Sequence, residues 1–145
     1  MGVVKTVNLK VLIVEDEMIL ALDVKYRLEK LGYNVVGIAD NGEDAIKLTK
    51  ERTPDVILMD VVIKGVMDGI DTTKQINKLY DTPIMYTTAY FDDDILKRTK
   101  KTKSYGYIIK PYQDGQINTA ILTAITKHQQ CPIHYSKFGL SKSKN

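Results

Sequence analysis

The stretch Val11-Leu12-Ile13-Val14-Glu15-Asp16-Glu17 (VLIVEDE) joins four apolar residues directly to three acidic ones. An apolar run without alternating polar residues is typical of a strand buried on both faces, as in a parallel sheet. In open parallel sheets, ligands bind outside the carboxyl ends of the strands. The stretch therefore predicts a buried strand that carries a group of carboxylates to the functional edge of such a sheet.

Similar apolar runs recur along the chain and alternate with helical patterns. Further strands are predicted over 35–38, 56–59, 83–86 and 107–109. Apolar residues at helical spacing predict a first helix with Leu20, Val24, Leu28 and Leu31, which Gly32 ends. The other helices are predicted to begin near Asn41, Asp68, Asp92 and Asp114. Five strand–helix units in succession predict an α/β fold with a parallel sheet.

Length and composition describe an ordinary globular protein. The chain has 145 residues, of which 43% are hydrophobic and 27% are charged, enough for one domain with a single core. Its apolar runs are too short to span a bilayer, and its first residues show no signal-peptide pattern. Its one cysteine, Cys131, excludes an internal disulfide framework and fits a reducing compartment. We therefore expect a cytoplasmic protein with no membrane partner.

The net charge of +3 is carried by the end of the chain. Lys137, Lys142 and Lys144 follow Gln130, where no acidic residue occurs, so the rest of the chain is neutral. A neutral body argues against nucleic-acid binding, which requires clustered Lys and Arg. The expected division is a lead-in over 1–9, one domain over 10–130 and a basic tail or linker start over 131–145. Whether the chain stands alone or belongs to a longer sensor protein is left open.

Several chemically active residues are predicted to meet at one edge of the sheet. The third strand ends at Asp60, the fourth at Thr87-Thr88-Ala89 and the fifth at Lys110-Pro111. Clustered carboxylates repel one another unless a cation joins them or a proton is held. Mg²⁺ suits such a cluster, since it binds one or two carboxylates, keeps several waters and accepts phosphate oxygens. A lysine beside it would supply a point charge for a phosphoryl group.

These motifs resemble the receiver domain of two-component response regulators. The resemblance spans about 10–129 and rests on VEDE at 14–17, ILMD at 57–60, TTAY at 87–90 and YGYIIKPY at 105–112. It implies a doubly wound (βα)5 fold with a five-stranded parallel sheet in the flavodoxin-like order 2-1-3-4-5. The stretch MDVVIKGVMDGID at 59–71 also resembles receivers attached to sensory histidine kinases.

The resemblance implies a phosphorylation site built around Asp60. Asp60 would be the phosphoacceptor, a carboxylate nucleophile that is already ionised at neutral pH. Glu15, Asp16 and Asp60, with the backbone carbonyl of Val62, would hold Mg²⁺ or Mn²⁺. Lys110 would contact both Asp60 and the phosphoryl group.

Further roles follow from the same resemblance. The hydroxyl of Thr88 would bind a phosphoryl oxygen, although Thr87 is a competing candidate. Tyr107 would turn inward when Thr88 moves, and the bond before Pro111 would be cis. In the family that this chain resembles, the positions of Val62 and Tyr90 tune how fast water attacks the acyl phosphate. An apolar Val62 and a bulky Tyr90 predict slow self-dephosphorylation, so the protein would be mainly a switch that catalyses its own phosphoryl transfer.

The implied partners are a sensor histidine kinase or a phosphotransfer domain. The fourth helix, fifth strand and fifth helix, over 92–129, would bind a downstream protein or a second copy of the chain. The main alternative is a pseudo-receiver that docks without phosphorylation, but it usually lacks the phosphoacceptor or the lysine. A haloacid-dehalogenase-type phosphatase would need a second aspartate where this chain has Val62. A flavodoxin-type phosphate loop would be repelled by the acids at 15–17, and a nucleic-acid binder would rely on the basic tail.

Overall fold

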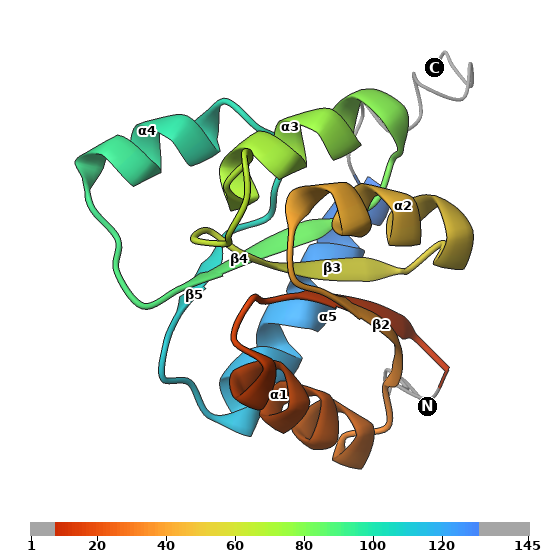
Figure 1. Ribbon diagram of the computed structural model, residues 1–145. Helices are drawn as coiled ribbons and strands as arrows, with labels where there is room; N and C mark the ends of the chain where they lie inside the picture. The colour runs from red at the N-terminus through yellow and green to blue at the C-terminus, as the bar shows by residue number, and fades with distance from the viewer. Residues whose placement is uncertain (1–7, 131–145) are drawn as a thin grey trace.

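The computed structural model describes residues 8–130, in which five parallel strands alternate with five helices (Figure 1). The elements are β1 (Lys10–Val14), α1 (Met18–Lys30), β2 (Asn34–Ala39), α2 (Gly42–Arg52), β3 (Val56–Asp60), α3 (Gly69–Leu79), β4 (Ile84–Thr88), α4 (Asp93–Lys100), β5 (Tyr107–Ile109) and α5 (Asp114–Gln130). The strand order is β2-β1-β3-β4-β5. The predicted α/β class and the order implied by the resemblance are both confirmed.

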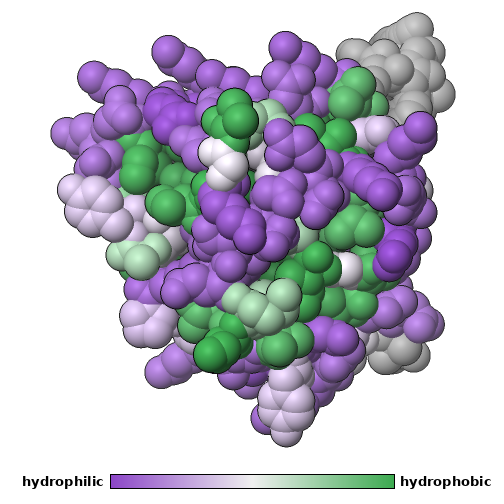
Figure 2. Space-filling view, viewed as in Figure 1, coloured by the Kyte–Doolittle hydropathy of each residue, from purple (hydrophilic) through white to green (hydrophobic). Residues whose placement is uncertain are grey.

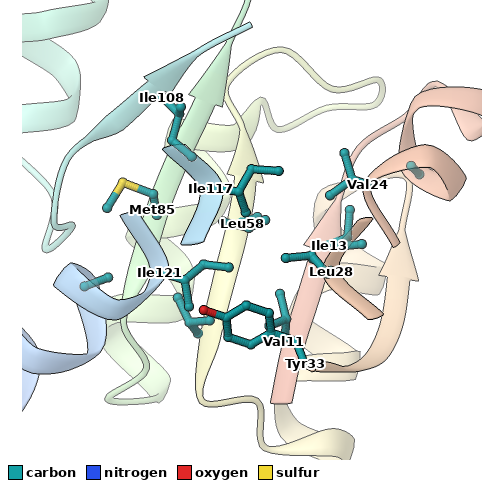
Figure 3. Close-up of a cluster of buried hydrophobic side chains, with 13 residues drawn as sticks. Val11, Ile13, Val24, Leu28, Tyr33, Leu58, Met85, Ile108, Ile117 and Ile121 are labelled. Atoms are coloured by element: carbon teal, nitrogen blue, oxygen red, sulfur yellow. The ribbon is translucent and has the colours of Figure 1, made fainter. Parts of the chain in front are cut away.

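The sheet separates two hydrophobic cores because neighbouring residues of a strand point to opposite faces. Val11 and Ile13 of β1 pack with α1 and α5, and Figure 3 shows this core. Leu12 and Val14 face the opposite side, where they pack with residues of α2 and α3. The central strands are therefore covered on both faces, as their continuous apolar runs predict.

The strand order reverses at β1, and this reversal creates the functional edge. β1 pairs with β2 on one side and with β3 on the other. The crossovers from β1 and from β3 therefore leave in opposite directions, which opens a crevice at the carboxyl ends of these two strands. The acidic residues after β1 and at the end of β3 lie at this switch point.

Three of the helix starts are confirmed by their capping bonds. The side chains of Asn41, Asp68 and Asp92 accept hydrogen bonds from backbone N–H groups three residues further on. Such bonds satisfy backbone donors that the first turn of a helix leaves unpaired. The buried stripe of α1 differs from the predicted one, because Ala21 is buried whereas Leu20 is exposed.

Within residues 8–130, no helix has the length and apolar character needed to cross a membrane. The basic tail over 131–145, with Cys131, and most of the lead-in lie outside the described residues.

Candidate functional site

Three carboxylates meet at the carboxyl edge of the sheet. Glu15 directly follows β1, and its N–H extends the sheet by donating to the Ala39 carbonyl at 2.9 Å. Asp60 is the last residue of the neighbouring strand β3. Glu15, Asp16 and Asp60 each offer a carboxylate oxygen within 4.8 Å of the others. Glu15 and Asp60 are buried, and Asp16 is half-buried.

Lys110 lies between two of these carboxylates. Its Nζ donates to Glu15 Oε1 and to Asp60 Oδ2, each at 2.6 Å. Burial lowers the pKa of Lys110, but the hydrogen bonds to the two acids outweigh burial and raise the pKa above its ordinary value. Lys110 is therefore charged at neutral pH, and one positive charge faces three carboxylates.

Asp60 is an acid in an environment that disfavours its charge. Burial raises its pKa from 3.8 to about 6, with a smaller contribution from the negative charge of Glu15. The contacts with Lys110 and the hydrogen bond that Val62 N–H donates to Oδ1 at 3.1 Å act in the opposite direction. The carboxylate is ionised at neutral pH, as a nucleophile requires, although its pKa lies above the ordinary value for aspartate.

The donor set fits a hard divalent cation. All three groups offer carboxylate oxygens, the ligands that Mg²⁺ prefers. Lys110 neutralises only part of their charge. Asp16 makes no hydrogen bond or ion pair with any other residue in the described range, so its oxygens remain available to a ligand. The site could therefore bind a metal ion.

The end of β4 lies beside the end of β3 and carries two buried threonines. Thr87 pairs with Asp60 in the sheet, and its carbonyl accepts from Val61 N–H at 2.9 Å. The Thr88 hydroxyl donates to the Tyr90 carbonyl at 2.7 Å and accepts from Tyr90 N–H at 3.2 Å. In this conformation the Thr88 hydroxyl is therefore held by the loop after β4.

Tyr107 of β5 points outward and is 46% exposed. Its ring meets the ring of Phe91 edge-on, with centroids 4.0 Å apart. Both residues line a cavity of about 310 Å³ between β5 and α4, together with Tyr86 and Leu96. The cavity leaves space beside the Tyr107 ring.

The remaining residues of the expected site lie around this edge. Val62 and Tyr90 are both exposed. The bond between Lys110 and Pro111 is cis, as the resemblance implies.

Gly69 holds the end of β3 and was missed by the sequence analysis. Its N–H donates to the Val61 carbonyl at 2.8 Å. A Cβ at this position would overlap the backbone carbonyl oxygen of Asp60. The start of α3 can approach β3 this closely only with glycine. The Asp68-Gly69 pair suggested a helix start but gave no indication of this contact.

Arg27 of α1 holds the loop that follows Lys110. Its Nε donates to Asp114 at 2.6 Å, and one terminal nitrogen donates to the Tyr112 carbonyl at 2.5 Å. The guanidinium also lies 5.3 Å from the centre of the Tyr112 ring. These partners are 85 or more residues away from Arg27 in the chain, so no local pattern reveals them.

Comparison with known proteins agrees with this geometry. Residues 11–122 match the response regulator receiver domain family. The transcriptional regulatory protein PdtaR of Mycobacterium tuberculosis is 31% identical over 121 residues, which cover 83% of this chain and 58% of PdtaR. LiaR of Bacillus subtilis, another transcriptional regulatory protein, is 35% identical over 118 residues, covering 80% of this chain and 56% of LiaR.

A solved structure of a receiver domain is also similar to this chain. The signal receiver domain of a modulated diguanylate cyclase from Desulfovibrio desulfuricans is 34% identical, with a TM-score of 0.79. The match covers 83% of this chain and 96% of that domain. The chain spans about half the length of the curated relatives it matches. It belongs to the response regulator receiver domain family of two-component signalling proteins.

Proposed function

We propose that Asp60 accepts a phosphoryl group in a His-Asp phosphorelay and that its phosphorylation switches the α4–β5–α5 face. The observation that carries the proposal is the pair of 2.6 Å contacts from Lys110 to Asp60 and Glu15. They hold a fixed positive charge beside a buried, ionised carboxylate, and Glu15 and Asp16 supply further oxygens. Phosphoryl transfer asks a protein mainly for such positioning and charge neutralisation.

The chemistry is an in-line displacement at phosphorus. An Asp60 oxygen forms a bond to phosphorus while the bond from phosphorus to the donor atom breaks, and the donor atom leaves with the electron pair. No general base is needed because the carboxylate carries no proton at neutral pH. The Lys110 ammonium group is close enough to follow the negative charge onto the phosphoryl oxygens.

The residues that would hold Mg²⁺, or Mn²⁺ in its place, are Glu15, Asp16, Asp60 and the backbone carbonyl of Val62. When bound, the ion would neutralise charge on the carboxylates and on the phosphoryl oxygens. Its affinity would come from the negative charge that Lys110 leaves uncompensated.

The proposed switch runs from Thr88 to Tyr107. The Thr88 hydroxyl can bind a phosphoryl oxygen only after it leaves the Tyr90 carbonyl, 2.7 Å away. Its movement would free space on the side of β4 that faces the cavity beside Tyr107. Tyr107 would then turn from its exposed position on Phe91 into that cavity. A downstream protein or a second copy of the chain would read the changed α4–β5–α5 face.

The proposed phosphoryl donor is a sensor histidine kinase or a phosphotransfer domain that docks on α1. Met18, Ile19, Leu22 and Tyr26 on this helix are all exposed, and Ile19 is 82% exposed. Figure 2 shows apolar side chains gathered near the start of α1. Because α1 begins directly after the acidic cluster, a partner bound to this apolar surface would bring its phosphohistidine close to Asp60.

The proposed receiver domain covers 10–130, with a lead-in over 1–9 and a basic tail or linker start over 131–145, and it acts in the cytoplasm. Support for the location comes from the single cysteine of the chain, which fits a reducing compartment.

The test is intact-mass measurement after incubation with acetyl phosphate or phosphoramidate, with and without Mg²⁺. We expect one Mg²⁺-dependent phosphoryl adduct on the native chain and none on Asp60→Asn. No adduct on the native chain, with Mg²⁺ binding retained, would favour the alternative of a pseudo-receiver that only docks. An adduct that persists in Asp60→Asn would refute Asp60 as the acceptor.

A further inference from the structure

A second surface stands apart from the phosphorylation site. A groove of about 620 Å³ runs between α3 and the segment after α4. Its lining includes Val66, Met67, Lys74, Lys78, Lys101 and Lys103, and we call it the basic groove. Its two pairs of lysines come from different parts of the chain, one from α3 and one from the segment after α4.

The positive charge of the basic groove is not neutralised by neighbouring acidic side chains among the described residues. None of its four lysines forms an ion pair in the described part of the chain, and all four are exposed. Asp71 also lines the groove, but Arg98 binds it at 3.3 Å and binds Asp68 at 2.8 Å. Lys74 and Lys78 are four residues apart on one helix, a spacing at which like charges destabilise the helix. Folding therefore gives no reason for this concentration of positive charge.

The walls of the groove are already fixed relative to each other. The Asn77 side chain accepts from Lys103 N–H at 2.7 Å and donates to the Lys103 carbonyl at 3.3 Å. The bridge from Arg98 to Asp68 and Asp71 joins α4 to the start of α3. A ligand would find the groove formed and would lose little affinity to ordering it.

The lining favours an acidic peptide over a nucleic acid. Single-stranded nucleic acids bind to aromatic stacking platforms, and arginine, with its planar fork of donors, suits duplex recognition better than lysine does. Among the described residues, none that lines the groove is aromatic, and Arg98 beside it is engaged by two aspartates. It does offer apolar contacts, since Val66 is 93% exposed and Met67 lines the same end. Lysines that surround apolar contacts suit carboxylates interspersed with apolar side chains.

We propose that the basic groove binds an acidic segment of a partner protein that also carries apolar side chains. The lysines would steer the segment and fix its direction, and Val66 with Met67 would receive an apolar side chain. Binding does not require a phosphoryl group on Asp60. Failure of this proposal would therefore leave the proposed receiver function intact, and failure of that function would leave this one standing.

The test is a fluorescence anisotropy titration with a labelled peptide of repeating Glu-Glu-Leu units. The double variant Lys74→Glu/Lys78→Glu should weaken binding by about tenfold or more, because close charge pairs contribute strongly across an interface. Lys47→Glu/Lys50→Glu makes the same change of charge on exposed positions of α2 and should leave binding nearly unchanged. Lys101→Glu/Lys103→Glu, on the opposite wall, should weaken binding as Lys74→Glu/Lys78→Glu does. Circular dichroism would check that each variant is folded.

Two further measurements distinguish among possible ligands of the basic groove. Val66→Ser should weaken binding of the Glu-Glu-Leu peptide and not of an all-Glu peptide of equal length. A labelled single-stranded oligonucleotide and a short DNA duplex should bind more weakly than the peptide at the same salt concentration. Equal losses in the groove and α2 variants, tighter binding of either nucleic acid, or no binding of the acidic peptide would each overturn the proposal.

Discussion

Replacing Asp60 with asparagine should make the metal-free protein more stable at neutral pH. The carboxylate is buried, and burial is the largest reason why its folded-state pKa rises from 3.8 to about 6. Asparagine has nearly the same shape and carries no charge, so it resembles the protonated acid. The substitution therefore removes the cost of an ionised group in this environment and keeps a polar side chain beside Lys110.

The size and sign of the effect follow from linkage. Each pH unit between the folded and unfolded pKa values corresponds to about 1.4 kcal/mol, so values of 3.8 and about 6 give a gain of at most roughly 3 kcal/mol. The acid has a raised pKa in the folded state. The stability that its protonated form contributes is therefore complete below about pH 4 and is lost as the pH rises through 6. The advantage of Asp60→Asn should appear over the same interval and level off above it.

The assay is urea unfolding of the native chain and of Asp60→Asn, both with chelator, over a series of pH values. Thr87→Val, a neighbouring change that removes no charge, is a control for general effects of substitution at this edge. Adding Mg²⁺ should then stabilise the native chain, by about 2.7 kcal/mol at a hundred times its dissociation constant, and should affect Asp60→Asn much less. An Asp60→Asn variant that is less stable than the native chain at every pH would refute the reasoning about the buried charge.

Three other substitutions test the site. Val62→Asn should shorten the lifetime of the acyl phosphate about fivefold, because one hydrogen bond that orients the attacking water contributes about 1 kcal/mol; an unchanged half-life, followed by intact mass, would contradict this. Gly69→Ala should destabilise the fold by about 2–3 kcal/mol through overlap with the Asp60 carbonyl, whereas Gly115→Ala, which meets nothing within 4 Å, should be neutral or stabilising in urea unfolding. Arg27→Ala should cost about 1–2 kcal/mol and slow the reaction with acetyl phosphate by loosening the loop after Lys110; equal rates with and without Arg27 would exclude that positioning role.

The sequence predicted those features that depend on local pattern. Continuous apolar runs identified the strands, and capping residues such as Asn41 and Asp92 identified helix starts. The rule that function lies at the carboxyl ends of parallel strands then brought Glu15, Asp60 and Lys110 together, and the structure has all three in contact. The prediction did not depend on side-chain geometry, because strand order alone decides which ends are neighbours.

Features that depend on the approach of distant segments were not predictable in this way. The close contact of Gly69 with Asp60 depends on how α3 returns to β3, and Arg27 binds residues more than eighty positions away. The exposed apolar residues of α1 have the same composition as a buried stripe, which is why Leu20 was misassigned. The basic groove was not predicted, because the part of the chain before the tail has no net charge. A net charge does not show which lysines the fold brings together.

The charges of the site explain how Lys110 could both stabilise the unphosphorylated protein and play its proposed part in phosphoryl transfer. In the unphosphorylated protein, Lys110 Nζ lies 2.6 Å from a carboxylate oxygen of Glu15 and 2.6 Å from one of Asp60. Its positive charge limits the repulsion between these two buried acids. A single positive charge cannot balance three carboxylates, so the site retains an attraction for a divalent cation. Phosphorylation of Asp60 would move negative charge outward onto the phosphoryl oxygens. The Lys110 ammonium group could move with this charge and still contact Glu15. Its movement would then displace the loop after Lys110, which Arg27 fixes to α1.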